Sequence, residues 1–161
     1  MKVKVSEATR HQLNWMVAKA EGHELMLFDA LWRDNAARKG YPAHEVERHL
    51  QWQPQRGRQI IVEVRHLQLD QRNPEVLTPT RCARDIPDYC TDWSQGGPII
   101  ERELLFPEPL LDTNCALIRW RCRNWKGDGS DFYGPTPLIS AMRCFCVSKL
   151  GEEVEVPEEL K

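Results

Sequence analysis

The stretch from Gly134 to Gly151 most constrains how this chain can fold, because it specifies a complete helix with both ends. Thr136 is a good N-cap, and Pro137 suits the first helical position, where a missing N–H costs nothing. Gly151 stands where a left-handed residue would end the helix, and Lys149 lies in the last turn. A period near 3.6 predicts one buried face, with Cys144 outside it; the face contains Leu138, Ile139, Met142, Phe145, Cys146 and Leu150.

The composition is that of an ordinary soluble protein. The chain has 161 residues, of which 41% are hydrophobic and 29% charged, and its formal net charge is −2. This length allows one domain with a substantial core. No apolar run reaches membrane-spanning length, and the first residues lack the apolar segment of a signal peptide, so a cytoplasmic protein is expected. The six cysteines are then expected to be reduced, and none forms a Cys-x-x-Cys pair.

The first half of the chain reads as helices followed by a strand. Residues 2–5 form a candidate edge strand, and Ser6 is a plausible N-cap for a helix through Glu21, with Gly22 as the residue beyond its end. Residues 24–39 fit either a strand beginning at Leu25 or a helix, and a helix is favoured over most of them. A short helix follows from Pro42. Alternation predicts a strand over 59–69, and 70–88 reads as loop with room for one short strand.

The second half predicts a helix, two strands and the C-terminal helix. Thr91 is expected to cap a helix whose inner face holds Trp93, Gly97, Ile100 and Leu104. Its Gly96-Gly97-Pro98 sequence is unfavourable in a helix and indicates close approach by another backbone. Residues 107–113 read as a proline-containing loop, 115–125 as a strand, and 132–133 as a returning strand. The order predicts an α+β fold in which a small, mainly antiparallel sheet packs with N-terminal, central and C-terminal helices.

Three segments resemble the NinX-like family of small phage proteins: residues 1–22, 89–103 and 134–160. The longest motif is the run Thr91-Asp92-Trp93-Ser94-Gln95-Gly96-Gly97-Pro98. This block and the terminal helix are also similar to the helix–sheet–helix sandwich domain of other small phage proteins. A single α+β domain over 1–161 is expected, and residues at about 23–88 depart from the family as a variable, insertion-like region. The resemblance implies no catalytic residues, and it gives a structural role to Thr91, Asp92, Trp93, Gly96, Gly97, Pro98, Thr136 and Gly151.

An alternation of basic and aromatic residues occupies the predicted strand 115–125. Arg119, Arg121 and Arg123 share one face at a spacing that could follow phosphates, and Trp125 could stack on a base. The alternative is a solvated face whose arginines pair with acidic residues while Trp120 enters the core. The solvated face is favoured, because the net charge is not basic and no nucleic-acid motif accompanies the patch.

Other polar clusters give weaker evidence for a metal, anion-binding or catalytic site. His44 and His49 miss the spacing that would place two ligands on one helical face, and no metal or cofactor is expected. Asp92 could belong to an anion pocket or could simply cap its helix, and capping is favoured. The acids at 101, 103, 128 and 131 are given no catalytic role. The acidic tail after Gly151 is read as a solvated edge strand or flexible end.

Two classes of function remain open, and an enzyme is the least expected. The first is a phage-encoded, non-enzymatic accessory protein in the bacterial host cytoplasm that binds a host or phage protein, such as a component of antiviral defence. Trp32 and Trp52 in the variable region would contribute to its partner surface, and a hydrophobic patch within 25–52 could also form a homodimer. The second is a small-ligand or nucleotide-sequestering protein, in which the Thr91–Pro98 helix start and the arginine strand converge. A nucleic-acid binder using 119–126 is a third possibility.

Overall fold

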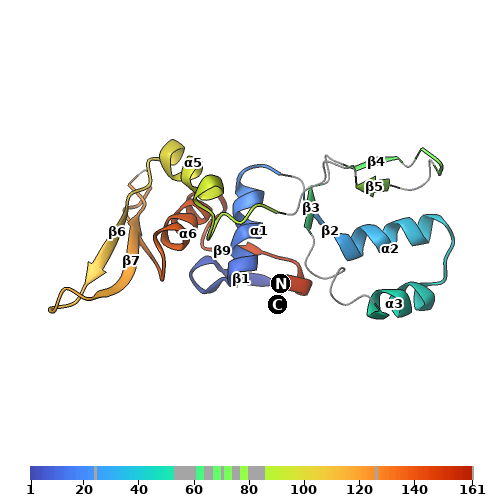
Figure 1. The fold of residues 1–161 in the computed structure, drawn as a ribbon, viewed down its shortest axis with the longest axis horizontal. Coiled ribbons are helices and arrows are strands. Elements are labelled where there is room, and N and C mark those ends of the chain that lie inside the picture. Colours follow the sequence, from blue (N-terminus) through green and yellow to red (C-terminus); the bar gives the residue numbers. More distant parts are fainter. Residues whose placement is uncertain are drawn as a thin grey trace. The chain divides into compact units, whose positions relative to one another are not determined.

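The computed structural model describes residues 1–23, 25–52, 61–63, 67–69, 71–73, 77–79, 86–125 and 127–160. The chain divides into two compact units (Figure 1). Residues Met1–Glu21 and Pro87–Glu159 form the first unit, and Gly22–Ile86 form the second. The second unit therefore nearly coincides with the region 23–88 that the sequence sets apart.

The C-terminal helix α6, Pro137–Leu150, is the centre of the first unit. Its ends follow the prediction: the Thr136 hydroxyl accepts the Ile139 N–H at 3.2 Å, and Gly151 follows with φ +88°. Its buried face is wider than predicted, because Cys144 has no exposed surface. Helix α6 packs against three strands and against the N-terminal helix, so both sides of it need apolar or small side chains. The prediction that Cys144 lies outside the buried face is therefore wrong.

Helix α1, Arg10–Ala20, packs on α6 and carries the buried residues Leu13, Met16 and Val17. Its N-cap is Thr9 and not Ser6, because Thr9 and Gln12 form a reciprocal capping box. Ser6 lies instead in the 3₁₀ turn η1, Val5–Glu7. The other end agrees with the prediction, since Gly22 follows the helix with φ +84°.

The two ends of the chain meet in a small sheet. Strand β1, Lys2–Lys4, pairs antiparallel with β9, Glu153–Glu155, and Val3 lies opposite Val154. The Met1 ammonium donates to the Val156 carbonyl at 2.7 Å. Val154 and Val156 are buried, so part of the acidic tail is an ordered strand that alternates inward valines with outward glutamates. The turn η3, Glu158–Leu160, follows.

Helix α5 spans Trp93–Glu103, and its N-cap is Asp92, one residue after the predicted cap Thr91. The Asp92 carboxylate accepts the Ser94 N–H at 2.8 Å, while the Thr91 hydroxyl donates to Asp88. The buried residues are Gly96 and Ile99, whereas Trp93 and Leu104 are more than half exposed. The predicted inner face is therefore wrong: the buried face of α5 carries Gly96 and Ile99, and Trp93 is not an inward anchor.

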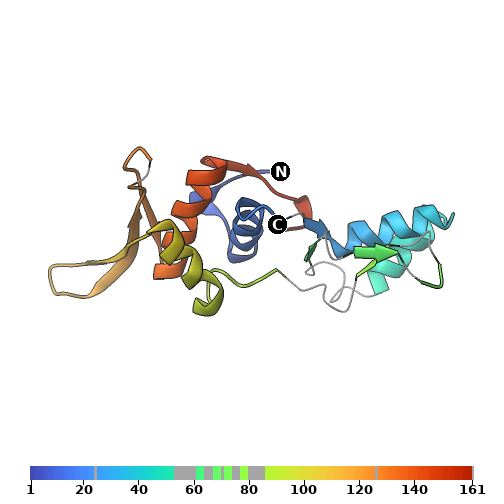
Figure 2. The same ribbon diagram turned by 90° about the horizontal axis from the view of Figure 1, so that it is seen from above.

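A three-stranded antiparallel sheet covers the other side of α6 (Figure 2). Its strands are β6, Pro107–Leu111, β7, Leu117–Arg123, and β8, Asp131–Gly134, in that order. β7 and β8 agree with the sequence. The reading of 107–113 as loop is wrong: β6 is an edge strand, the position in a sheet where Pro107 and Pro109 are tolerated. Cys122 in β7 is fully buried.

The second unit contains two helices and two short strand pairs. Strand β2, Leu25–Leu27, pairs antiparallel with β3, Ile61–Glu63, and β4, Leu67–Leu69, pairs with β5, Leu77–Pro79. Helix α2, Phe28–Arg38, and helix α3, Ala43–Trp52, are joined by an Arg33–Glu47 ion pair at 2.7 Å. Residues 24–39 thus contain a strand and then a helix. The rest of the predicted strand 59–69 lies outside the described residues.

The element order confirms the α+β class with antiparallel sheets. No helix among the described residues is long and apolar enough to cross a membrane.

Candidate partner-binding surface

A long hairpin formed by β6 and β7 extends away from α6 (Figures 1 and 2). Asp112 builds its turn: one carboxylate oxygen accepts the N–H groups of Asn114 and Ala116, each at 2.8 Å. Cys115 closes the turn with φ +61° and donates its N–H to the Asp112 carbonyl. This is the three-residue hairpin turn that ends in a left-handed residue. The hairpin is therefore specified by its own local sequence.

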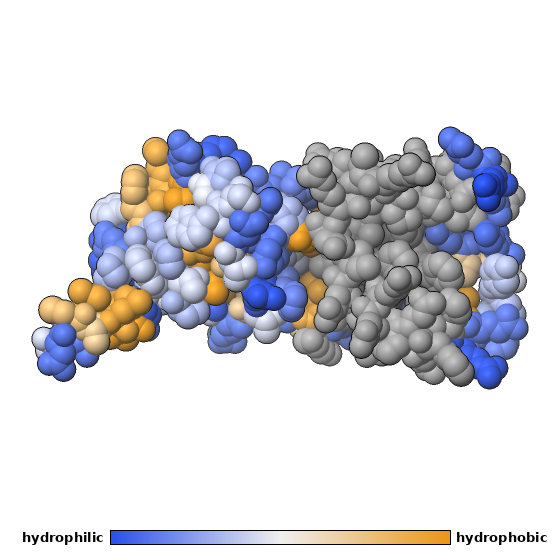
Figure 3. All heavy atoms as spheres, in the orientation of Figure 1, coloured by the Kyte–Doolittle hydropathy of each residue, from blue (hydrophilic) through white to orange (hydrophobic). Residues whose placement is uncertain are grey.

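Apolar side chains gather on this hairpin and at its base. Of the large hydrophobic side chains that the structure describes as exposed, most fall between Trp93 and Tyr133. We call six of them the hairpin surface: Leu104, Phe106, Leu111, Leu117, Ile118 and Trp125. Apolar atoms are visible on the projecting hairpin in Figure 3. Ile118 and Trp125 are 63% and 62% exposed, which is a large apolar area to leave in water.

The base of the hairpin is concave. Leu104, Phe106, Glu108 and Trp125 line a cavity of about 450 Å³. Leu104 reaches it because this residue ends α5 in the left-handed conformation, with φ 55°, and turns the chain toward β6. An aromatic and aliphatic hollow with one carboxylate at its edge can receive an apolar side chain from another molecule. The hairpin surface thus combines a projecting tip with a hollow base.

The three arginines of β7 lie beside this surface, and two of them form ion pairs. Arg121 contacts Glu108 at 2.7 Å and Asp131 at 3.7 Å, while Arg123 contacts Asp131 at 2.8 Å. The hydrogen bond that Arg123 donates holds the pKa of Asp131 below its usual range, and the hydrogen bond that Arg121 donates to Glu108 raises the pKa of Arg121. The favoured reading of an acid-paired face therefore holds for these two residues, and Trp120 is partly buried.

Two of the β7 arginines, Arg119 and Arg123, also contact aromatic rings. The Arg119 guanidinium stacks on the Tyr133 ring at 4.1 Å, and the Arg123 guanidinium lies 5.1 Å from the Trp125 ring centre. These cation–π contacts occupy one face of each ring. The arginine strand is thus stacked and paired within the sheet, and Trp125 still exposes most of its surface.

The remaining predicted site residues are placed as follows. Trp32 lies in α2 and Trp52 ends α3, and their side chains lie outside the described part of the chain, as do Cys82 and His66. Asp92 caps the start of α5 and the Thr91 hydroxyl donates to Asp88, and neither these residues nor the β7 arginines line the two cavities described here. Gly96 approaches the Tyr89 carbonyl and the Leu138 side chain, whereas Gly97 only touches Trp93 and Pro98 is exposed.

Five cysteines of the first unit are described, and all five carry free thiols. Cys90, Cys122, Cys144 and Cys146 are free and buried, and Cys115 is free and exposed at the hairpin turn. Burial raises the pKa of the Cys90 thiol to about 12. No group of three or more potential ligands that could hold a metal ion occurs among the described residues.

Sequence reasoning missed the hairpin surface. The signal was present in the paired runs Leu110-Leu111 and Leu117-Ile118, which flank an Asp-x-Asn turn sequence. The two prolines of β6 concealed it, since proline inside a run argues against a central strand but not against an edge.

One known protein family matches the chain over most of its length. The family model described as Bacteriophage P22, NinX matches residues 4–149. The chain belongs to the NinX family. The resemblance seen at the two ends and in the α5 block is thereby confirmed, and the limits of the match also enclose residues 23–88. Comparison with curated proteins gave no match.

Proposed function

We propose that this NinX-family protein is a non-enzymatic phage accessory protein that binds another protein through the hairpin surface. The observation that carries the proposal is the exposed apolar hairpin itself. A free apolar surface of this kind is costly in solution and is typical of sites that a partner covers. The phage family supports a target in the bacterial host cytoplasm, and a component of antiviral defence or another host factor is the kind of target we place first.

The shape of the surface favours protein over nucleic acid. Leu111, Leu117 and Ile118 at the tip are aliphatic, and Trp125 with Phe106 forms the aromatic base. Aromatic and aliphatic anchors around a hollow are typical of protein interfaces. Nucleic-acid surfaces instead present unpaired basic side chains along the backbone path, whereas Arg121 and Arg123 are balanced by Glu108 and Asp131.

The hairpin turn offers a chemical handle for the test. Cys115 is exposed, whereas Cys90, Cys122, Cys144 and Cys146 are buried. A photo-crosslinking maleimide placed on Cys115, in a Cys82→Ser background, would report contacts made at the tip. Extract from phage-infected host cells would be irradiated with the labelled protein, with and without nuclease, and the adducts identified by mass spectrometry.

The decisive comparison uses charge substitutions in the surface. A double variant, Leu117→Asp with Ile118→Asp, should abolish the adduct, because two carboxylates would have to be buried in the interface. Tyr41→Asp, an equally exposed apolar position in the second unit, should leave it unchanged. The expected result is one protein adduct that survives nuclease and disappears only in the double variant. An adduct lost with nuclease, or retained by the double variant, would contradict the proposal.

A further inference from the structure

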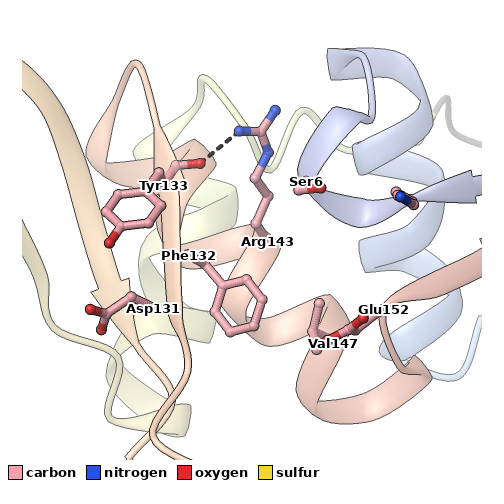
Figure 4. Close-up of a pocket in the computed structure, with 8 residues that line it drawn as sticks. Ser6, Asp131, Phe132, Tyr133, Arg143, Val147 and Glu152 are labelled. Atoms are coloured by element: carbon pink, nitrogen blue, oxygen red, sulfur yellow. Dashed lines mark hydrogen bonds between the residues drawn. The ribbon is translucent and has the colours of Figure 1, made fainter.

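A second cavity, of about 370 Å³, lies in the first unit away from the hairpin surface. Its lining comes from three places: β1 and η1, strand β8, and the α6 helix with the residues just after it. Figure 4 shows Phe132 and Val147 on its apolar side, with Arg143 extending from α6 between β8 and Ser6. A volume of this size accommodates a small organic molecule.

Arg143 is a partly buried cation in the lining of this cavity. One terminal nitrogen donates to the Tyr133 carbonyl at 2.6 Å, and the other donates to the Ala8 carbonyl at 3.4 Å. Its Nε is enclosed, and no described residue accepts a hydrogen bond from it. Burial lowers the pKa of Arg143, because the charged guanidinium is partly removed from water. Two carbonyls use two of its five N–H donors, so the guanidinium retains donors for an anion.

The other charged residues that line the cavity are Lys4, Asp131 and Glu152. The Asp131 side chain lies on the far side of β8 from Arg143 in Figure 4, and it is paired with Arg121 and Arg123. Lys4 lines the cavity at its β1 side, and Glu152 is the acid that remains. Lys4 and Arg143 therefore face Glu152 and an Asp131 carboxylate that two other arginines already pair. A partly desolvated cation is stabilised by an oxyanion, since charge pairing is stronger where water is excluded.

We infer that this cavity binds a small organic molecule bearing an oxyanion, with the charged group held by Arg143 and Lys4 and the apolar part against Phe132 and Val147. This site is separate from the hairpin surface and does not depend on the proposed protein partner. Arg143 also ties β8 to the N-terminal segment, so a bound anion would strengthen a link already present in the unit.

The test is a titration of the full chain with three probes at low ionic strength: inorganic phosphate, adenosine monophosphate and adenosine. Calorimetry would give affinities, and amide shifts of residues 131–133 and 143–147 would locate binding. Phosphate and the nucleotide should bind at these residues, and adenosine should not. Equal binding of adenosine and the nucleotide, or shifts that avoid these residues, would overturn the inference.

Four single substitutions are expected to have different effects on the affinity for the anionic probes. Lys4→Met should weaken anion binding about two- to fivefold, as expected for one exposed charge. Lys2→Met, the neighbouring outward lysine of β1, should change nothing, because Lys2 does not line the cavity. Glu152→Gln should strengthen binding. Arg143→Met should weaken it by at least about tenfold, as expected for hydrogen bonds to a charged group.

The pattern remains decisive even if Arg143→Met fails to fold, because the three other positions are exposed. Equal losses in Lys2→Met and Lys4→Met would show diffuse attraction and overturn the site. The hairpin double variant should bind the probes as wild type does, so failure of this inference and failure of the proposed function are distinguishable.

Discussion

Gly96 and Gly97 are adjacent in α5 but meet different surroundings. A Cβ at Gly96 would overlap the Tyr89 carbonyl oxygen and a Leu138 methyl group, while a Cβ at Gly97 would make only an ordinary contact with Trp93, at 3.8 Å. The glycine pair in the sequence therefore predicted a close approach correctly, and Leu138 places the C-terminal helix at that contact. Which of the two glycines makes the close contact depends on which side of α5 faces the core. The sequence does not reveal that side, because the large apolar Trp93 is exposed.

Gly96→Ala should destabilise the protein by about 1–3 kcal/mol, because a backbone carbonyl and a packed methyl group must move. Gly97→Ala should stabilise it by about 0.5–1 kcal/mol, because alanine is the better helix former. Urea unfolding followed by circular dichroism measures both. Equal effects of the two substitutions would contradict the assignment.

Asp88 connects helix α1 to the start of α5. Asn14 donates to its carboxylate at 2.9 Å and accepts the Cys90 N–H at 3.1 Å. Burial alone would raise the pKa of Asp88, but hydrogen bonds from Thr91 and Asn14 outweigh it, so the pKa is lowered. A lowered folded-state pKa gives stability that is present above the unfolded pKa and is lost as pH falls through the folded one.

Thr91→Val should therefore cost up to about 1 kcal/mol at pH 7, since it removes one hydrogen bond to this carboxylate. The difference from wild type should shrink as the pH falls from about 5 to about 2, where Asp88 is protonated in both proteins. Unfolding curves at pH 7, 4 and 2.5 would show the trend. A difference that is independent of pH would mean that the hydroxyl acts through packing alone.

At the scale of elements, the β6–β7 hairpin is the least expected piece of the fold. Its turn needs a left-handed residue after Asn114, and Cys115 occupies that position with φ +61°. A side chain costs about 1–2 kcal/mol there, and glycine avoids that cost. The absence of glycine at this position is one reason why the turn was hard to identify from sequence.

Cys115→Gly should stabilise the protein by about 0.5–1 kcal/mol, the strain relieved less the added freedom of the unfolded chain. Cys115→Ser keeps the left-handed strain and should change stability little. Guanidinium unfolding under reducing conditions compares the two variants. Equal stability of the glycine and serine variants would show that the turn is not strained.

Elements with strong local signals were predictable, and those defined by tertiary contact were not. Thr136, Pro137 and Gly151 locate α6 to the residue because each acts on its own backbone. The start of α1 was misplaced because Ser6 and Thr9 are both good caps, and the Gln12 side chain decides between them. The β6–β7 hairpin has a local signal in its paired apolar runs, but the exposure of those apolar residues has none, because exposure depends on which tertiary neighbours are absent.

At the scale of the whole molecule, the first unit carries its own core. Buried residues from both chain segments meet there, including Val5, Met16, Ile99, Cys122 and Phe145. The Asn14–Asp88 hydrogen bond shows that the chain leaves and re-enters this unit within a short distance. The second unit is one continuous segment, Gly22–Ile86.

Replacing residues 22–86 with eight Gly/Ser residues should leave the first unit folded. Such a linker spans about 15 Å on average. The gap to be bridged is similar, because Asn14 in the middle of α1 hydrogen-bonds Asp88, and only the second half of the helix separates Asn14 from Glu21. Cooperative thermal unfolding and dispersed amide resonances would confirm an independent domain. A molten or aggregated product would instead support one domain over the whole chain.

The pairing of β1 with β9 has a consequence for how the protein is made. β1 cannot pair until β9 has been synthesised, because Met1 and Val156 are 155 positions apart. At bacterial rates of about 5–20 residues per second, that wait is about 8–30 s. The Gly22–Ile86 segment can fold during this interval, whereas the β1–β9 pairing of the first unit must wait until β9 has left the ribosome. Nascent chains in which α6 has left the exit tunnel and β9 has not should therefore expose the apolar inner face of α6 to chaperones.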